Sequence, residues 1–137
     1  MNDFVLDASV ALGWLIDDPP SPYSQRVQQL MLGGAKAVVP VHWHLQIANA
    51  LLMAERRKIL HRELSDVLAD IGALTSFIET DVTADDIGTI VGVGRRELLT
   101  AYDAAYVALA ARLNVALATQ DSAMISAARR LKIPISR

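Results

Sequence analysis

Hydrophobic positions in this chain alternate between short continuous runs and stretches with helical spacing. A continuous apolar run predicts a strand that is buried on both faces of a sheet. Apolar residues three and four positions apart are typical of an amphipathic helix. We therefore expect strands at 4–7, 36–40, 76–80, 115–119 and 133–136 and helices at 9–16, 23–34, 43–58, 61–75, 83–98, 100–114 and 121–132.

The order of these elements predicts the fold class. Strand and helix alternate over the whole length, which favours an α/β fold with a mostly parallel sheet covered by helices on both faces. No segment has the composition of a linker, so we expect a single domain over residues 1–137. In such sheets, ligands bind at the carboxyl ends of the strands.

Composition narrows the class of protein further. Hydrophobic residues make up 53% of the chain and charged residues 20%, so a substantial core can form. The sequence has no apolar run of the roughly 20 residues that span a bilayer. Its first residues include acids where a secretory signal needs basic residues. Cysteine is absent, which excludes disulfides and thiolate metal sites and suits a reducing compartment. We expect a cytoplasmic protein.

Three aspartates stand close to predicted strand ends. Asp7 directly follows the first apolar run, Asp121 lies two residues after 115–119, and Asp103 lies in the first turn of the helix at 100–114. Either strand-end aspartate alone could equally be a helix cap. Because a parallel sheet brings all three toward one edge, we favour a shared acidic pocket.

Such a pocket calls for a cation. Like charges raise one another's pKa unless a positive charge neutralises them, and hard ions such as Mg²⁺ or Mn²⁺ prefer oxygen ligands. Zinc fits poorly, since the chain has no cysteine and three histidines. A metal held by carboxylates activates water and offsets charge on a phosphodiester. The net charge of −2 excludes a general polyanion binder, so RNA would be handled at this local site.

Four segments carry a resemblance to a known family. They are VLDASVALGWL, VVPVHWHLQIANALL, LTAYDAAYVALAARL and LATQDSAMISAARRLKIPI, and from the first to the last they extend over residues 5–135. In this order they resemble the PIN-domain ribonucleases, most specifically the VapC toxins of bacterial toxin–antitoxin pairs. The resemblance implies a PIN-like α/β/α sandwich, a metal-dependent endoribonuclease that cleaves RNA with a metal-activated water, a homodimer, and a small VapB-like antitoxin that blocks the site.

The resemblance also implies roles for individual residues. Asp7 matches the first acid of the family, Asp103 the acid of the YDAAYVALA motif, and Asp121 the acid after the strand that ends in ATQ. These three are implied as the catalytic and metal-binding residues. Ser9 and Thr119 match hydroxyl positions that orient ligands or water.

The second acid of the family is replaced in this chain. The usual pattern W-x-x-E-x-x-N-x-L reads WHLQIANAL here, so Gln46 occupies the glutamate position. Glutamine keeps an oxygen that can ligate a metal, but it lacks the charge and cannot act as a base. Asn49 matches the polar position three residues later, where it either faces the site or ties its helix to a neighbouring loop.

Several interpretations of Gln46 stay open at this point. The chain is a weakened or selective nuclease, a non-catalytic PIN-like module that binds antitoxin or RNA, or a variant engineered to remove an acid. A phosphotransfer receiver-like domain also gathers acids at strand ends, but Asp103 falls within a helix and Lys132 is the sole late lysine.

Neighbouring residues do not replace the missing acid. Glu55 lies across the helix from Gln46 at about 100° per residue. His42 is expected in a loop after Pro40. Tyr106 is expected to pack, and Arg130 to extend from the last helix into solvent.

Overall fold

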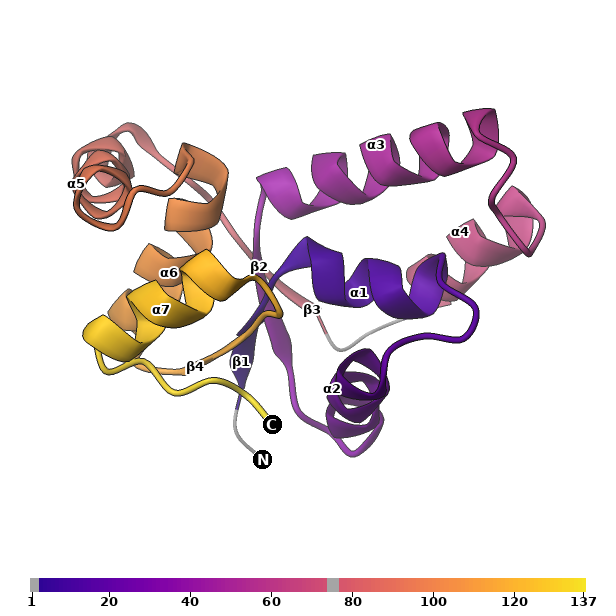
Figure 1. The fold of residues 1–137 in the computed structure, drawn as a ribbon, viewed down its shortest axis with the longest axis horizontal. Coiled ribbons are helices and arrows are strands. Elements are labelled where there is room, and N and C mark those ends of the chain that lie inside the picture. Colours follow the sequence, from indigo (N-terminus) through magenta and orange to yellow (C-terminus); the bar gives the residue numbers. More distant parts are fainter. Residues whose placement is uncertain (1–2, 74–76) are drawn as a thin grey trace.

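The computed structural model describes residues 3–73 and 77–137 of the chain, and strands and helices alternate along it (Figure 1). The strands are β1 (Phe4–Leu6), β2 (Ala37–Pro40), β3 (Phe77–Thr80) and β4 (Ala116–Ala118). The helices are α1 (Ala8–Leu15), α2 (Pro22–Leu32), α3 (His42–Arg56), α4 (Leu64–Ala73), a short 3₁₀ helix (Ala84–Asp86), α5 (Ile87–Glu97), α6 (Ala101–Leu113) and α7 (Ser122–Arg130).

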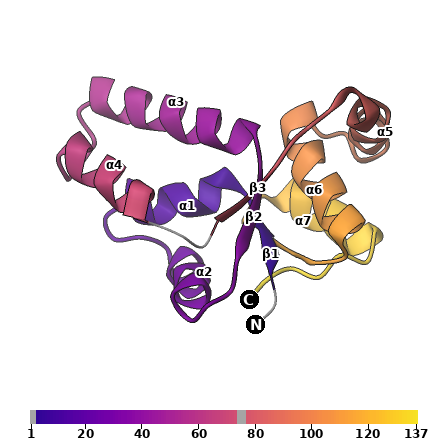
Figure 2. The ribbon, with the colours of Figure 1, turned by 180° about the vertical axis from the view of Figure 1, so that it is seen from behind.

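The four strands form one parallel sheet in the order β3-β2-β1-β4. In the middle of the sheet, Val5 is in register with Val38 of β2 and with Leu117 of β4. Helices α1 to α4 lie on one side of the sheet and α5 to α7 on the other, as Figures 1 and 2 show from opposite directions. The predicted α/β/α sandwich with a parallel central sheet is confirmed.

The core lies where the central strands meet the helices. All residues of β1 and β2 are buried, as the continuous apolar runs predicted. Trp43 of α3 and Tyr106 of α6 are the two largest side chains that are almost completely buried. Burial of each large apolar side chain contributes on the order of 1.5–3 kcal/mol to stability.

Asp7 alone separates β1 from helix α1, and α1 packs closely on α2. A Cβ atom added at Gly13 would lie 2.2 Å from Oγ of Ser24, whose side chain is buried in α2. The close approach of these two helices therefore depends on glycine at this position. This packing fixes α1, whose first turn borders the acidic pocket.

The structure corrects two predictions about where elements begin and end. Residues 133–136 form no strand but a single parallel bridge between Ile135 and Leu117. Proline at 134 has no N–H to donate, so the ladder does not continue. His42 is the first residue of α3 instead of a loop residue. A proline restricts the residue before it more than those after it, so Pro40 ends β2 without delaying the helix.

Other predicted boundaries shift by a few residues. The helix expected from 61 begins at Leu64, and the helix expected over 83–98 begins as a 3₁₀ turn that Thr83 and Asp86 close with a capping box. Residues 74 and 75 of a predicted helix and residue 76 of a predicted strand lie outside the described residues. Within the described residues, no helix combines the length and the apolar character needed to cross a bilayer.

Candidate functional site

Three aspartates and one glutamine line a single cavity at the carboxyl edge of the sheet. Asp7 lies between β1 and α1, Asp103 in the first turn of α6, and Asp121 at the start of α7. Gln46 reaches the same cavity from α3. The cavity has a volume of about 240 Å³, and Met124 and the first turn of α1 complete its wall. Polar side chains from four segments that are distant in sequence thus meet in one cavity.

Asp7 is buried and is held by hydroxyl groups. The Ser9 hydroxyl donates to Oδ2 of Asp7 at 2.8 Å, and the Thr119 hydroxyl donates to the same oxygen at 2.9 Å. The backbone N–H of Ser9 donates to Oδ1 at 3.2 Å, so Asp7 also caps α1. Asp7 therefore serves both as the cap of α1 and as a lining residue of the pocket.

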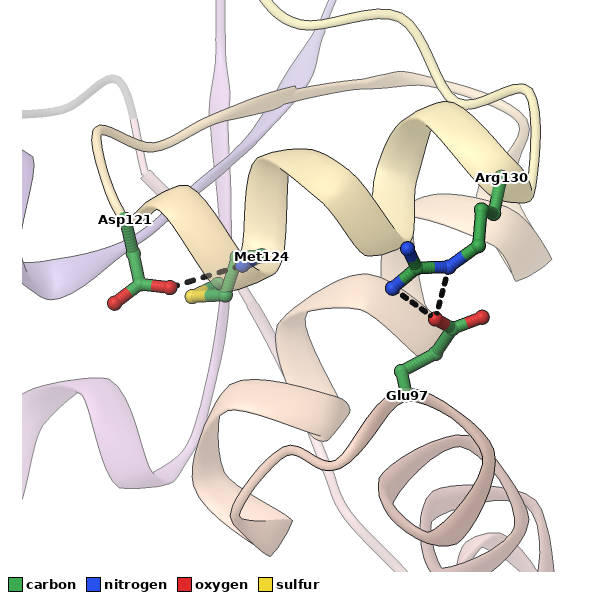
Figure 3. A network of polar contacts seen from close by, with 4 residues as sticks. All are labelled: Glu97, Asp121, Met124 and Arg130. Atoms are coloured by element: carbon green, nitrogen blue, oxygen red, sulfur yellow. Dashed lines mark hydrogen bonds and ion pairs between the residues drawn. The ribbon is translucent and has the colours of Figure 1, made fainter.

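Thr119 connects the first and the last of the three acids. Its hydroxyl donates to Asp7 and accepts a hydrogen bond from the backbone N–H of Asp121 at 3.1 Å. Asp121 in turn caps α7 by accepting from the N–H of Met124 at 2.9 Å (Figure 3). Thr119 is buried, whereas Asp121 is exposed. The pocket therefore opens to solvent on the side of Asp121.

The pKa of the Asp103 carboxyl depends on burial and on the charges of the other two acids. Burial raises the pKa of its carboxyl above the ordinary value, and the charges of Asp7 and then Asp121 raise it further. A hydrogen bond with Thr100 acts in the opposite direction on this pKa. The sequence predicted the effect of the neighbouring acids on this pKa, whereas burial is the larger cause.

Gln46 is held by a residue that the sequence analysis assigned to packing alone. The hydroxyl of Tyr106 donates to Oε1 of Gln46 at 2.5 Å. Tyr106 is fully buried, and burial, followed by the charge of Asp7, raises the pKa of its hydroxyl. Tyr106 lies three residues after Asp103 on the same face of α6, and that spacing was the available signal for its place beside the site.

One residue proposed for the neighbourhood of the site lies away from the cavity. Asn49 is exposed on α3 and does not line the cavity. Glu55 does not line it either, in agreement with its expected place across the helix from Gln46. His42 lies against Tyr106 with ring centroids 5.0 Å apart. Its Nε2 is 3.2 Å from the carbonyl oxygen of Tyr102, and burial lowers its pKa.

The structure also has an apolar groove, which sequence reasoning did not distinguish from core. The groove lies between the start of α3, α5 and the start of α6 and has a volume of about 310 Å³. Val41, Ile87, Val91 and Tyr102 line it with exposed side chains. Tyr102 precedes Asp103 in the sequence, so the first turn of α6 contributes one side chain to the groove and one to the acidic pocket.

Helix α7 is anchored at the end opposite the pocket. Its last residue, Arg130, forms an ion pair with Glu97 of α5, with Nη2 and Nε of the arginine at 2.5 and 2.6 Å from Oε2 (Figure 3). Arg130 is exposed, as expected, but the sequence did not reveal its ion pair with Glu97. Glu97 is buried and draws the guanidinium to it, because an unpaired buried carboxylate is costly.

The donor set suits a hard cation in its chemistry. Carboxylate and hydroxyl oxygens from Asp7, Asp103, Asp121 and Ser9 border one cavity, and these are the ligands that Mg²⁺ and Mn²⁺ prefer. Over residues 3–73 and 77–137, no three acidic or histidine side chains stand close enough together to enclose an ion. Binding would thus require at least one carboxylate to turn further into the cavity.

Comparison with known proteins bears on the fold. The structure is similar to the crystal structure of PAE2754 from Pyrobaculum aerophilum, with a TM-score of 0.67 and 21% sequence identity. The match covers 91% of this chain and 84% of that one. No protein-family model matches the sequence. No curated protein matches it either.

Proposed function

We propose that this protein is a VapC-like toxin, a Mg²⁺- or Mn²⁺-dependent endoribonuclease that acts in the cytoplasm. One observation carries the proposal: three aspartates from three different elements line one cavity together with Gln46. Each of the four sequence segments that resemble the PIN-domain ribonucleases contributes one of these side chains. Burial, and after it the charges of Asp7 and Asp121, raises the pKa of Asp103, and a shifted carboxyl pKa in a cavity is typical of a functional site.

In this proposal the residues divide into ligands and supports. Asp7, Asp103 and Asp121 would hold the cation, which activates water and offsets negative charge on the phosphodiester when it is bound. The hydroxyls of Ser9 and Thr119 fix the carboxylate of Asp7, so that it does not reorganise when RNA arrives.

Partners are part of the same proposal. A VapB-like antitoxin and a second copy of the chain in a homodimer both require apolar surface. The apolar groove between α3, α5 and α6 offers such a surface, with Ile87 at 58% and Tyr102 at 61% exposure. Exposed apolar side chains gathered in one place are typical of a protein interface.

A second function is favoured by a specific observation. Oε1 of Gln46 already accepts a hydrogen bond from Tyr106, so the neutral side chain is only in part free to serve a cation. A non-catalytic PIN-like module that binds antitoxin or RNA would tolerate this arrangement. The two functions differ in whether RNA is cut.

The test is cleavage of a mixed RNA pool with Mg²⁺ or Mn²⁺. We expect the natural chain to cut slowly and Gln46→Glu to cut at least about tenfold faster, since it restores a charge at the site. Asp7→Asn in the Gln46→Glu background should lower the rate by at least about 100-fold. Circular dichroism of each variant controls for folding. Absence of cleavage by both the natural chain and Gln46→Glu would favour the binding module.

A further inference from the structure

The two ends of the Gln46 amide have opposite chemistry, and only one of them can meet the acidic pocket. Oε1 accepts hydrogen bonds and can ligate a cation, whereas the Nε2 group donates two hydrogen bonds and repels a cation. Gln46 lines the pocket, and Tyr106 contacts its Oε1 at 2.5 Å. If Oε1 faces Tyr106, the Nε2 group of the amide is the one left to face the pocket.

The surroundings of Tyr106 determine the direction of this hydrogen bond. The side chain is fully buried, which keeps the hydroxyl protonated. The buried hydroxyl proton needs an acceptor, and an amide oxygen provides one while an amide N–H₂ group does not. The bond that forms is donation from the Tyr106 hydroxyl to Oε1 of Gln46.

The geometry points to Tyr106 as a positioning residue that turns Oε1 of Gln46 away from the pocket and presents the Nε2 N–H₂ group to it. The inference rests on the proposed function for its consequence. Gln46 then serves as a neutral donor to an anionic oxygen, either of a pocket carboxylate or of a substrate phosphate. It does not serve as a fourth oxygen ligand of the cation.

Calorimetric titration of the full chain with Mn²⁺ alone tests this consequence. Gln46→Met keeps the length of the side chain and removes both ends of the amide, and we expect its Mn²⁺ affinity to stay within about threefold of the natural chain. Tyr106→Phe frees the amide to rotate, so affinity should stay the same or increase. A loss of about tenfold or more in either folded variant is the effect expected for a ligand or its support. Such a loss would overturn the inference.

Gln46→Glu provides the positive control. One carboxylate oxygen can accept from Tyr106 while the other faces the pocket, so Mn²⁺ should bind at least about tenfold more tightly. If neither this variant nor the natural chain binds Mn²⁺, the proposed function fails while the orientation of the amide is still open to measurement.

Nuclear Overhauser effects in the metal-free natural chain measure that orientation without any substitution in the sample. The Gln46 amide protons are assigned by their disappearance in Gln46→Glu. We expect weak or no Overhauser transfer from these amide protons to the ring protons beside the Tyr106 hydroxyl. The reason is that Oε1 of Gln46, and not Nε2, contacts that hydroxyl. Strong transfer would place the nitrogen at the hydroxyl and contradict the assignment of Tyr106.

Discussion

An acid lies at each end of helix α7, and the two acids differ in whether a basic side chain pairs with them. At its carboxyl end, the side chain of Glu97 is 4% exposed and pairs with Arg130, which is 58% exposed. At its amino end, Asp121 shares a cavity with Asp7 and Asp103, and in the described part of the chain none of these three forms an ion pair. Figure 3 shows both ends of the helix.

This contrast separates a structural acid from a functional one. A buried carboxylate with a guanidinium partner is compensated, so its cost to stability is small while the pair remains intact. The carboxylates around the cavity have neutral donors as partners, and burial together with the charges of Asp7 and Asp121 raises the pKa of Asp103. Such unrelieved charge is expected where a ligand supplies the missing compensation.

The largest effect on stability should come from breaking the compensated pair. Arg130→Ala leaves Glu97 buried without a cation, and we expect a loss of about 2 kcal/mol, below the usual range for buried pairs because the arginine is half exposed. Arg129→Ala, on the exposed side of the same turn, is the matched control. Urea denaturation at pH 7 measures both. Equal effects of the two substitutions would show that the pair contributes nothing.

A smaller loss should follow when the uncompensated site loses a neutral donor. Thr119→Val keeps the shape of the side chain but leaves Asp7 and the N–H of Asp121 without a shared partner, at a cost of about 1–2 kcal/mol. Ser9→Ala removes a donor from an exposed residue, where water can replace it, and should cost less. The same denaturation experiment compares them, and a larger effect of Ser9→Ala would contradict this account of Asp7.

The smallest effect should have the opposite sign. Asp103→Asn removes one of the repelling charges, so we expect the Tm at pH 7 to rise by about 2 °C. The control is Asp66→Asn, an exposed acid in the first turn of α4, which should give no such rise.

The pH dependence of that effect follows from the direction of the pKa shift. Because the pKa of Asp103 is raised on folding, the folded state binds more protons than the unfolded state above the ordinary value of 3.8. The natural chain therefore loses stability as pH rises through this window, and the advantage of Asp103→Asn should vanish below about pH 4. Thermal unfolding from pH 3 to 8 measures the difference, and an advantage that does not depend on pH would contradict the cause given for the shift.

The fold was predictable because hydrophobic periodicity is local. Continuous apolar runs identified β1 and β2, and their alternation with helices indicated the parallel sheet. The same apolar pattern wrongly predicted a strand at 133–136. Hydrophobicity does not show that Pro134 lacks the N–H that a strand needs for its hydrogen bonds.

The candidate site was predictable in part. Parallel topology alone brings residues after β1 and β4 to one edge, and this made the convergence of Asp7 and Asp121 foreseeable. The bond between Tyr106 and Gln46 joins residues 60 positions apart, and the pair of Arg130 and Glu97 joins residues 33 apart. Such contacts depend on how helices pack, and no sequence pattern records them. The catalytic roles of the acids remain a prediction.

The central claim is that the acidic pocket, and not another acidic surface, is where a cation binds. Paramagnetic broadening of backbone amide signals by Mn²⁺ tests it directly in the full natural chain. We predict that broadening at low Mn²⁺ concentration centres on Ala8, Ser9, Asp103 and Met124, and that Arg130 at the far end of α7 is affected least. Broadening centred on Asp85 and Asp86, in the 3₁₀ turn before α5, or spread evenly over the surface, would contradict the account.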